Sequence, residues 1–251
     1  MTFTLVALFT ASLLQPIPER PTGSRVPVAS DVAMQAREVR KYQAKFGQCV
    51  VARNAAAARQ FVLATEWKRS DSRGVMSKIL DGDCLAAATA AMDGVRMTFP
   101  ADSMRHTLAE ALLLREYPTA AAPPVKDAGP IAQLPFAEAD YVPKPGSKPK
   151  PGELESLAAD RSRRIAMVFL SEFGECVARA NPEQGFALVR TAPDSSEERA
   201  AFKGLQPAFA GCLAANESLQ FARPVLRGAV AINLYRLAHA PRVAAAAGAP
   251  R

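Results

Sequence analysis

The chain has 251 residues, of which 49% are hydrophobic and 22% are charged, and its formal net charge is +7. The apolar fraction is enough for a packed core, and the length allows one large domain or two of ordinary size. The positive charge is spread thinly along the chain, whereas a nucleic-acid-binding protein concentrates basic residues on one face. We therefore expect no specific nucleic-acid binding.

The N-terminus has the character of an export signal. Residues 1–14 are uncharged and mostly apolar, and a polar, proline-rich stretch follows them. The apolar segment is too short to cross a bilayer as a helix, which needs about 20 residues. We expect the apolar core of a secretory signal peptide at 1–14, although its usual basic start is missing, and a disordered linker at 15–30. A buried N-terminal helix is the alternative, and no other stretch predicts a transmembrane segment.

Four cysteines form two pairs with matching surroundings. Cys49 and Cys176 each lie in a Phe-Gly-x-Cys-Val sequence, and Cys84 and Cys212 are each followed by Leu-Ala-Ala. The separations within the pairs are 35 residues (84 − 49) and 36 residues (212 − 176). The match indicates one unit that occurs twice in the chain.

Further matches extend the repeat beyond the cysteines: Phe61 with Phe186, Asp71 with Asp194, Phe99 with Phe221, Arg105 with Arg227, and Ala109 with Ala231. The offset drifts by a few residues, as small insertions in connecting loops would cause. We predict an all-α fold that is a tandem duplication, with helical repeat 1 at 31–117 and helical repeat 2 at 153–240. Similarity by chance between alanine-rich helices is the alternative.

Each copy is expected to contain about four helices. Apolar residues recur at spacings of three and four around the first cysteine of each copy, which is typical of an amphipathic helix. Breaks are expected at Asn54 and Asn181, and Ser195 with Glu198 has the spacing of a capping box at a helix start. No alternating segment is long enough to predict a strand.

The cysteines are expected to form structural disulfides. Neither Cys49 nor Cys176 belongs to a Cys-x-x-Cys redox motif, and zinc ligands usually come in closer pairs. A module of about 80 residues has a modest core, and a disulfide closing a loop of about 35 residues adds roughly 3–4 kcal/mol. The repeat favours Cys49–Cys84 with Cys176–Cys212, while Cys49–Cys212 with Cys84–Cys176 stays open. Disulfides persist in oxidising compartments, so we expect a periplasmic or secreted protein.

The copies are separated by a proline-rich linker at 118–152, whose composition favours extended, polyproline-like structure. Four apolar side chains within it can pack onto one of the copies as a clasp: Ile131, Leu134, Phe136 and Tyr141. The alanine-rich tail at 241–251 is expected to be disordered.

Few residues stand out as candidates for a site. Arg105 and Arg227 occupy the same place in the last helix of each copy and can hold an anion across a pseudo-twofold axis, or can make an ion pair or capping contact within each copy. Trp67, the single tryptophan, is a candidate partner contact or a half-buried loop residue. His106, matched by Gly228, is a candidate catalytic residue or, by default, a surface residue at a helix start. We expect no metal or cofactor.

Three functions are compatible with these features, and no Gly-x-Ser-x-Gly, P-loop or His-Glu-x-x-His motif is present. The first is a non-catalytic extracytoplasmic binding or interaction protein, whose ligand lies between the copies or in a helix groove and whose partner is an envelope component or a protein. The second is a periplasmic stress or holdase-like factor, which predicts a large exposed apolar patch. The third is an enzyme with an unrecognised carboxylate or His106 site, which predicts a concave pocket with a perturbed titratable group.

Overall fold

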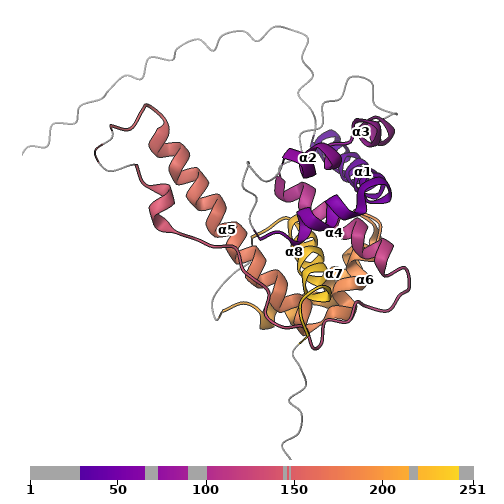
Figure 1. Ribbon diagram of the computed structural model, residues 1–251. Helices are drawn as coiled ribbons and strands as arrows, with labels where there is room; N and C mark the ends of the chain where they lie inside the picture. The colour runs from indigo at the N-terminus through magenta and orange to yellow at the C-terminus, as the bar shows by residue number, and fades with distance from the viewer. Residues whose placement is uncertain are drawn as a thin grey trace, which may run out of the picture.

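The computed structural model describes residues 29–65, 73–89, 101–143, 146, 148–214 and 220–242 (Figure 1). Within these ranges the chain is all-α, as the sequence predicts, apart from one isolated bridge between Ala128 and Arg242. None of the helices in this part of the chain is long and apolar enough to cross a membrane. Four predictions fall outside the described residues: the signal peptide at 1–14, nearly all of the linker at 15–30, Trp67, and most of the tail at 241–251.

Four helices form the first half of the molecule: α1 (Ala29–Leu63), α2 (Arg73–Ile79), α3 (Gly82–Thr89) and α4 (Ala101–Glu116). The helix α1 is kinked, because Asn54 leaves helical geometry with φ −134° and ψ 45°. The side chain of Asn54 donates a hydrogen bond to Lys78 O of α2 at 3.1 Å. The predicted break at Asn54 is therefore present, and α2, α3 and α4 all pack against α1.

The second half contains α5 (Glu153–Ala180), α6 (Pro182–Arg190), α7 (Ser196–Gly211) and α8 (Arg223–Ala238), and a short 3-10 helix, η1 (Glu138–Tyr141), precedes it. Asn181 ends α5 and caps α6, because its side chain accepts a hydrogen bond from Gln184 N at 3.2 Å. Ser195 caps α7 by accepting from Glu198 N at 3.0 Å. Both helix starts are therefore where the sequence predicts them.

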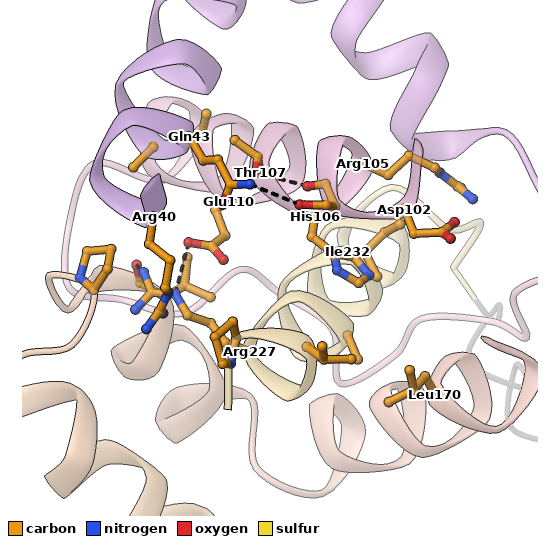
Figure 2. Close-up of a pocket in the computed structure, with 18 of the residues that line it drawn as sticks. Arg40, Gln43, Asp102, Arg105, His106, Thr107, Glu110, Leu170, Arg227 and Ile232 are labelled. Atoms are coloured by element: carbon orange, nitrogen blue, oxygen red, sulfur yellow. Dashed lines mark hydrogen bonds and ion pairs between the residues drawn. The ribbon is translucent and has the colours of Figure 1, made fainter. Parts of the chain in front are cut away.

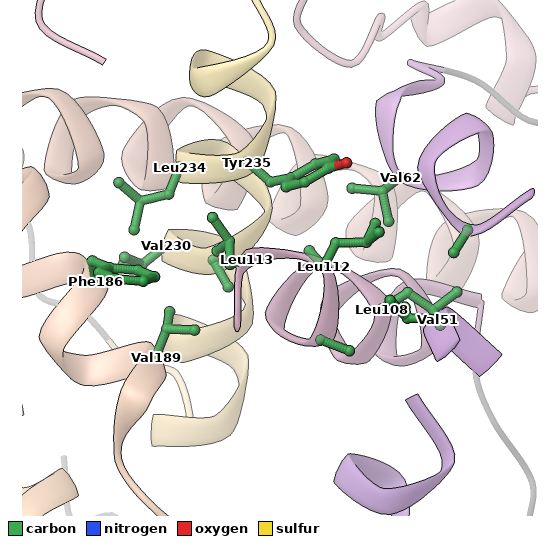
Figure 3. Packing of buried hydrophobic residues seen from close by; sticks show 14 of the residues in the cluster. Val51, Val62, Leu108, Leu112, Leu113, Phe186, Val189, Val230, Leu234 and Tyr235 are labelled. Carbon is green, nitrogen blue, oxygen red and sulfur yellow. The ribbon is translucent and has the colours of Figure 1, made fainter. Parts of the chain in front are cut away.

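Helices α4 and α8 pack against each other, and the apolar core continues through both halves (Figure 3). The largest fully buried side chains include Leu112 and Leu113 from α4 and Leu234 and Tyr235 from α8. Burial of apolar surface stabilises a fold by about 25 cal/mol per Å². The contact between α4 and α8 therefore joins the two halves into one core.

Each half contains one disulfide, in the pairing that the repeat favours. Cys49–Cys84 joins α1 to α3 with a Cα–Cα distance of 5.5 Å, and Cys176–Cys212 joins α5 to the end of α7 with 5.8 Å. Both distances are ordinary for a disulfide. The exchanged pairing is excluded, because each cysteine is bonded within its own half.

The Phe-Gly-x-Cys-Val sequence has a packing explanation in both halves. A Cβ atom on Gly47 would lie 2.6 Å from Thr107 Cγ2 of α4, and one on Gly174 would lie 2.5 Å from Ala229 O of α8. These distances are shorter than any ordinary non-bonded contact, so glycine is what lets each long helix approach the last helix of its half. The phenylalanine and the valine of the motif are buried in both halves.

Residues 118–137, called the strap below, lie on the second half in irregular conformation. Ile131 of the strap packs against the core, and Gln133 accepts a hydrogen bond from Ser171 of α5 at 2.7 Å. Arginine side chains of the second half also donate hydrogen bonds to strap carbonyl oxygens: Arg190 to Pro118 and Thr119, Arg242 to Pro124, Arg179 to Ala128 and Gly129, Arg236 to Ala132, and Arg164 to Pro135.

Candidate functional site

A cavity of about 770 Å³ lies between α1 and α4 of the first half and α5 and α8 of the second (Figure 2). This volume is in the usual range for small-molecule sites, about 300–1,000 Å³. The segment 189–193, Phe221 before α8 and Leu134 of the strap complete the lining. Arg105, Arg227 and His106 all line this cavity, so the structure brings three of the sequence candidates to one place.

The lining from the first half is mostly polar, and the lining from the second half is mostly apolar but includes arginines. Two positions are called matched when their residue numbers differ by 127, as those of Cys49 and Cys176 do, or by 122, as those of Arg105 and Arg227 do. Six matched pairs in the lining have their polar member in the first half: Arg40/Met167, Gln43/Leu170, Asp102/Pro224, Ser103/Val225, Thr107/Ala229 and Glu110/Ile232. Two pairs are reversed, Ala44/Ser171 and Leu114/Arg236. Figure 2 shows Arg40, Gln43 and Glu110 approaching from α1 and α4, and Leu170 and Ile232 from α5 and α8.

A network of ion pairs closes one end of the cavity. Arg40 contacts Asp194 and Glu198, each at 2.6 Å, and Arg227 contacts Glu198 at 3.0 Å and Glu110 at 2.9 Å. Burial works to raise the pKa of Glu198, but hydrogen bonds from Arg40 and from Asp194 N outweigh it and hold the pKa below its usual value. Burial raises the pKa of Glu110, despite its contact with Arg227. Arg227 is therefore a buried cation between two carboxylates.

Arg105 and Arg227 both cap the end of a preceding helix. Nη2 of Arg227 donates to Val189 O at 2.9 Å and to Thr191 O at 3.0 Å, where α6 ends. Nη2 of Arg105 donates to Val62 O at 3.0 Å and to Ala64 O, where α1 ends. These are the capping contacts that the sequence left open as an alternative, and an additional role in holding an anion stays a prediction. A cation at this end of a helix is also favoured by the helix dipole.

The surroundings of the two arginines differ in charge. Nε of Arg105 is buried, and within the described residues it has no hydrogen-bond partner. Burial, together with the nearby charge of Arg236, lowers the pKa of Arg105 to about 10. Burial also lowers the pKa of Arg236, which donates to Ala132 O of the strap. This end of the cavity therefore holds two buried guanidinium groups.

His106 lies near the start of α4, as the sequence predicts by default, and is half-buried in the lining of the cavity. Its ring points from α4 toward α8 and packs so closely on Gly228 that a Cβ atom there would lie 2.3 Å from Cγ of His106 (Figure 2). The ring reaches the cavity because the glycine leaves space for it. Burial, assisted by the charge of Arg105, lowers the pKa of His106 to about 4, so the imidazole is neutral at neutral pH.

The pKa of His106 and the apolar part of the lining bear on what the cavity can do chemically. A general base works best with a pKa near the working pH, and the pKa of His106 is well below that. In the described part of the chain, no group of three or more His, Cys, Asp or Glu side chains is placed to hold a metal ion. The apolar wall can take a hydrocarbon body, and the arginines and the neutral imidazole can take a polar group.

Several residues in the lining or in the ion-pair network beside it were not anticipated from the sequence. Glu198 was recognised only as a capping residue, yet its carboxylate lies between two arginines. Arg40 and Arg236 are basic residues on amphipathic helices, a pattern that usually indicates a solvated face. Their position in the cavity follows from how α1, α4 and α8 pack, which no local pattern encodes. No protein-family model matches the chain, and no curated protein or solved structure is significantly similar to it.

Proposed function

We propose that this protein is a non-catalytic binding protein whose ligand is a small amphipathic molecule held in the cavity between the two halves. The observation that carries the proposal is the division of the cavity into a polar wall from α1 and α4 and an apolar wall from α5 and α8. A ligand with an apolar body and a polar group would satisfy both walls at once, whereas a wholly apolar ligand would leave buried polar groups unpaired.

The proposal includes a tandem duplication of one helical module, at 31–117 and 153–240, joined by the linker at 118–152. Three matched contacts support it: the glycine of each Phe-Gly-x-Cys-Val sequence against the last helix, the disulfide in each half, and the arginine cap in each half. His106 and Gly228 are matched positions that touch each other. Matched positions meet in this way where a twofold axis passes through an interface, so we place a pseudo-twofold axis there.

The proposed location is the periplasm or the extracellular space. Two disulfides support an oxidising compartment, since cytosolic thiols are kept reduced. The apolar segment at 1–14 would supply the export signal. The partner that delivers or receives the ligand would then be an envelope component or another exported protein.

The two alternatives from the sequence have weaker support. A holdase would use a large apolar patch, but the exposed large apolar side chains of the described residues are spread over α1, α3, α5 and the segments between helices. An enzyme would use a cavity with perturbed titratable groups, and Asp102, His106 and Glu110 fit that description. The low pKa of His106 and the ion pairing of Glu110 favour binding over proton transfer.

The proposed function is tested by titrating the purified, disulfide-bonded protein with Nile red, an uncharged dye whose fluorescence rises in apolar surroundings. The variant Ala166→Phe places a ring in the cavity from α5 and is expected to weaken dye binding by about tenfold or more, because it removes the volume that the dye occupies. The control is Ala159→Phe, an exposed position of the same helix, which should bind as the unmodified protein does. Equal dye binding by both variants, or none by the unmodified protein, would contradict the proposed function.

A further inference from the structure

Three arginines that line the cavity have buried side chains. The exposed fractions are 8% for Arg105, 3% for Arg227 and 7% for Arg236. Burying a cation is unfavourable unless carboxylates or several hydrogen bonds compensate it. The groups that compensate the charge of each arginine therefore indicate which kind of ligand the cavity can bind.

Only one of the three is paired with carboxylates. Arg227 has Glu110 and Glu198 within 3.0 Å. Within the described residues, neither Arg105 nor Arg236 has a carboxylate within the 4.0 Å that defines an ion pair. The carboxylates that act on them from farther away are Asp102 for Arg105 and Glu175 for Arg236. The pKa of each arginine is lowered in spite of these carboxylates.

Hydrogen bonds compensate these two arginines only in part. Arg105 uses Nη2 for two carbonyl oxygens, while its Nε has no partner in the described part of the chain. Arg236 has one hydrogen bond there, from Nη2 to Ala132 O. Arg163 and Asp102 line the cavity near Arg105 as well, so three arginines and one carboxylate are found there and the cavity keeps a net positive charge at this end.

We propose that the cavity binds an amphiphile with an anionic head group, which lies against Arg105 and Arg236 while its hydrocarbon body lies along the apolar wall. This rests on the proposed function and adds the charge of the ligand to it. A carboxylate or a phosphate accepts hydrogen bonds from two guanidinium groups at once and removes the unfavourable burial of both cations. Leu170, Phe221 and Ile232 line the same cavity and provide apolar contact for the body.

The test is displacement of Nile red from the full-length protein at pH 7.5 by dodecanoate and by dodecanol, which share a hydrocarbon chain and differ in charge. Dodecanoate is expected to bind about tenfold or more tightly than dodecanol, the effect of one hydrogen bond to a charged group. Arg236→Gln should reduce this preference severalfold, since Arg105 remains, and leave the affinity for dodecanol unchanged, and Arg236→Lys should keep more of it. Dodecyl phosphate in the same assay shows which head group is preferred.

Arg236 also holds the strap, so its loss needs a matched control. Arg179→Gln removes another arginine that binds strap carbonyls but does not line the cavity, and it should retain the preference for the anion. Equal affinities of dodecanoate and dodecanol, or an equal loss in Arg179→Gln and Arg236→Gln, would overturn the anionic ligand. If neither dodecanoate nor dodecyl phosphate displaces the dye, the anionic ligand is overturned as well. The proposed function would still stand in that case if Ala166→Phe weakened dye binding as expected.

Discussion

The two halves of this molecule build the same kind of scaffold and line it differently. In each half a glycine of the long helix packs against the last helix, and a disulfide lies beside that glycine. An arginine of the last helix caps the end of a preceding helix. The side chains that face the cavity are mostly polar from the first half and mostly apolar from the second. The positions needed for packing are thus alike in the two halves, whereas the positions around the shared cavity differ, and this asymmetry gives the cavity its amphipathic character.

The largest difference between the halves is expected at the matched arginines. Arg227→Met should destabilise the protein by about 3–5 kcal/mol, because it leaves Glu110 buried without its cation and Glu198 with one cation fewer. Arg105→Met should cost about 1–2 kcal/mol, because it leaves only carbonyl groups at a helix end. Urea unfolding followed by circular dichroism measures both values. Equal losses would show that the carboxylates do not depend on Arg227.

The two disulfides should contribute similarly to stability and differently to reactivity. Replacing either pair by alanines should cost about 3–4 kcal/mol, because each bond closes a loop of about 35 residues. Cys84 is fully buried, whereas Cys176 is exposed, so dithiothreitol should reduce Cys176–Cys212 first. Urea unfolding of the two double variants and mass spectrometry after alkylation check these expectations. Earlier reduction of Cys49–Cys84 would contradict the second.

The two glycines of the shared motif should respond unequally to alanine. Gly174→Ala should cost about 1–3 kcal/mol, because the new methyl group meets a backbone oxygen of α8 that cannot move without separating the helices. Gly47→Ala should cost less, about 0–1 kcal/mol, because its nearest obstacle is the methyl group of Thr107 and the backbone oxygen of α4 lies 3.0 Å away rather than 2.5 Å, while alanine favours the helix by about 1 kcal/mol. Thermal unfolding of both variants gives the comparison, and a larger loss at Gly47 would reverse it.

His106 should make the stability of the fold depend on pH. The pKa of His106 is about 4 in the fold and about 6.5 in an unfolded chain, so the unfolded state binds the proton more readily. Stability is therefore complete above pH 6.5 and is lost as the pH falls toward 4, by about 2 kcal/mol between pH 7.5 and pH 5. Urea unfolding at the two pH values should show this loss in the unmodified protein and lack it in His106→Gln. The same pH dependence in both proteins would place the titration elsewhere.

Local signals in the sequence were sufficient for the helices and their ends. Asn54, Asn181 and Ser195 act on the backbone within a few residues of their own position, so their effect can be predicted without knowing the fold. The disulfide pairing was also predicted, because the spacing within each pair repeats.

The cavity could not be predicted, because it depends on which helices meet. His106 is an ordinary histidine in its own helix, and it is placed in the cavity only by Gly228, which lies across the interface. One signal was available in the sequence: the matched positions are a large ring and a glycine. In a twofold arrangement matched positions can face each other across the interface. Two large side chains would not fit between α4 and α8, so a large ring on one helix requires a small residue on the other.

The way in which the strap is held determines which substitutions it can accept. Five arginines hold it by its carbonyl oxygens, which every residue type provides. Its prolines lack the N–H group and keep the chain extended, so the carbonyl groups remain open to donors from the second half. Strap positions with exposed side chains should therefore accept substitution as long as the backbone follows the same path, whereas Val125 and Ala128 are buried in the core and should not. Much of the information that fixes this segment is thus stored in the arginines of the surface that receives it.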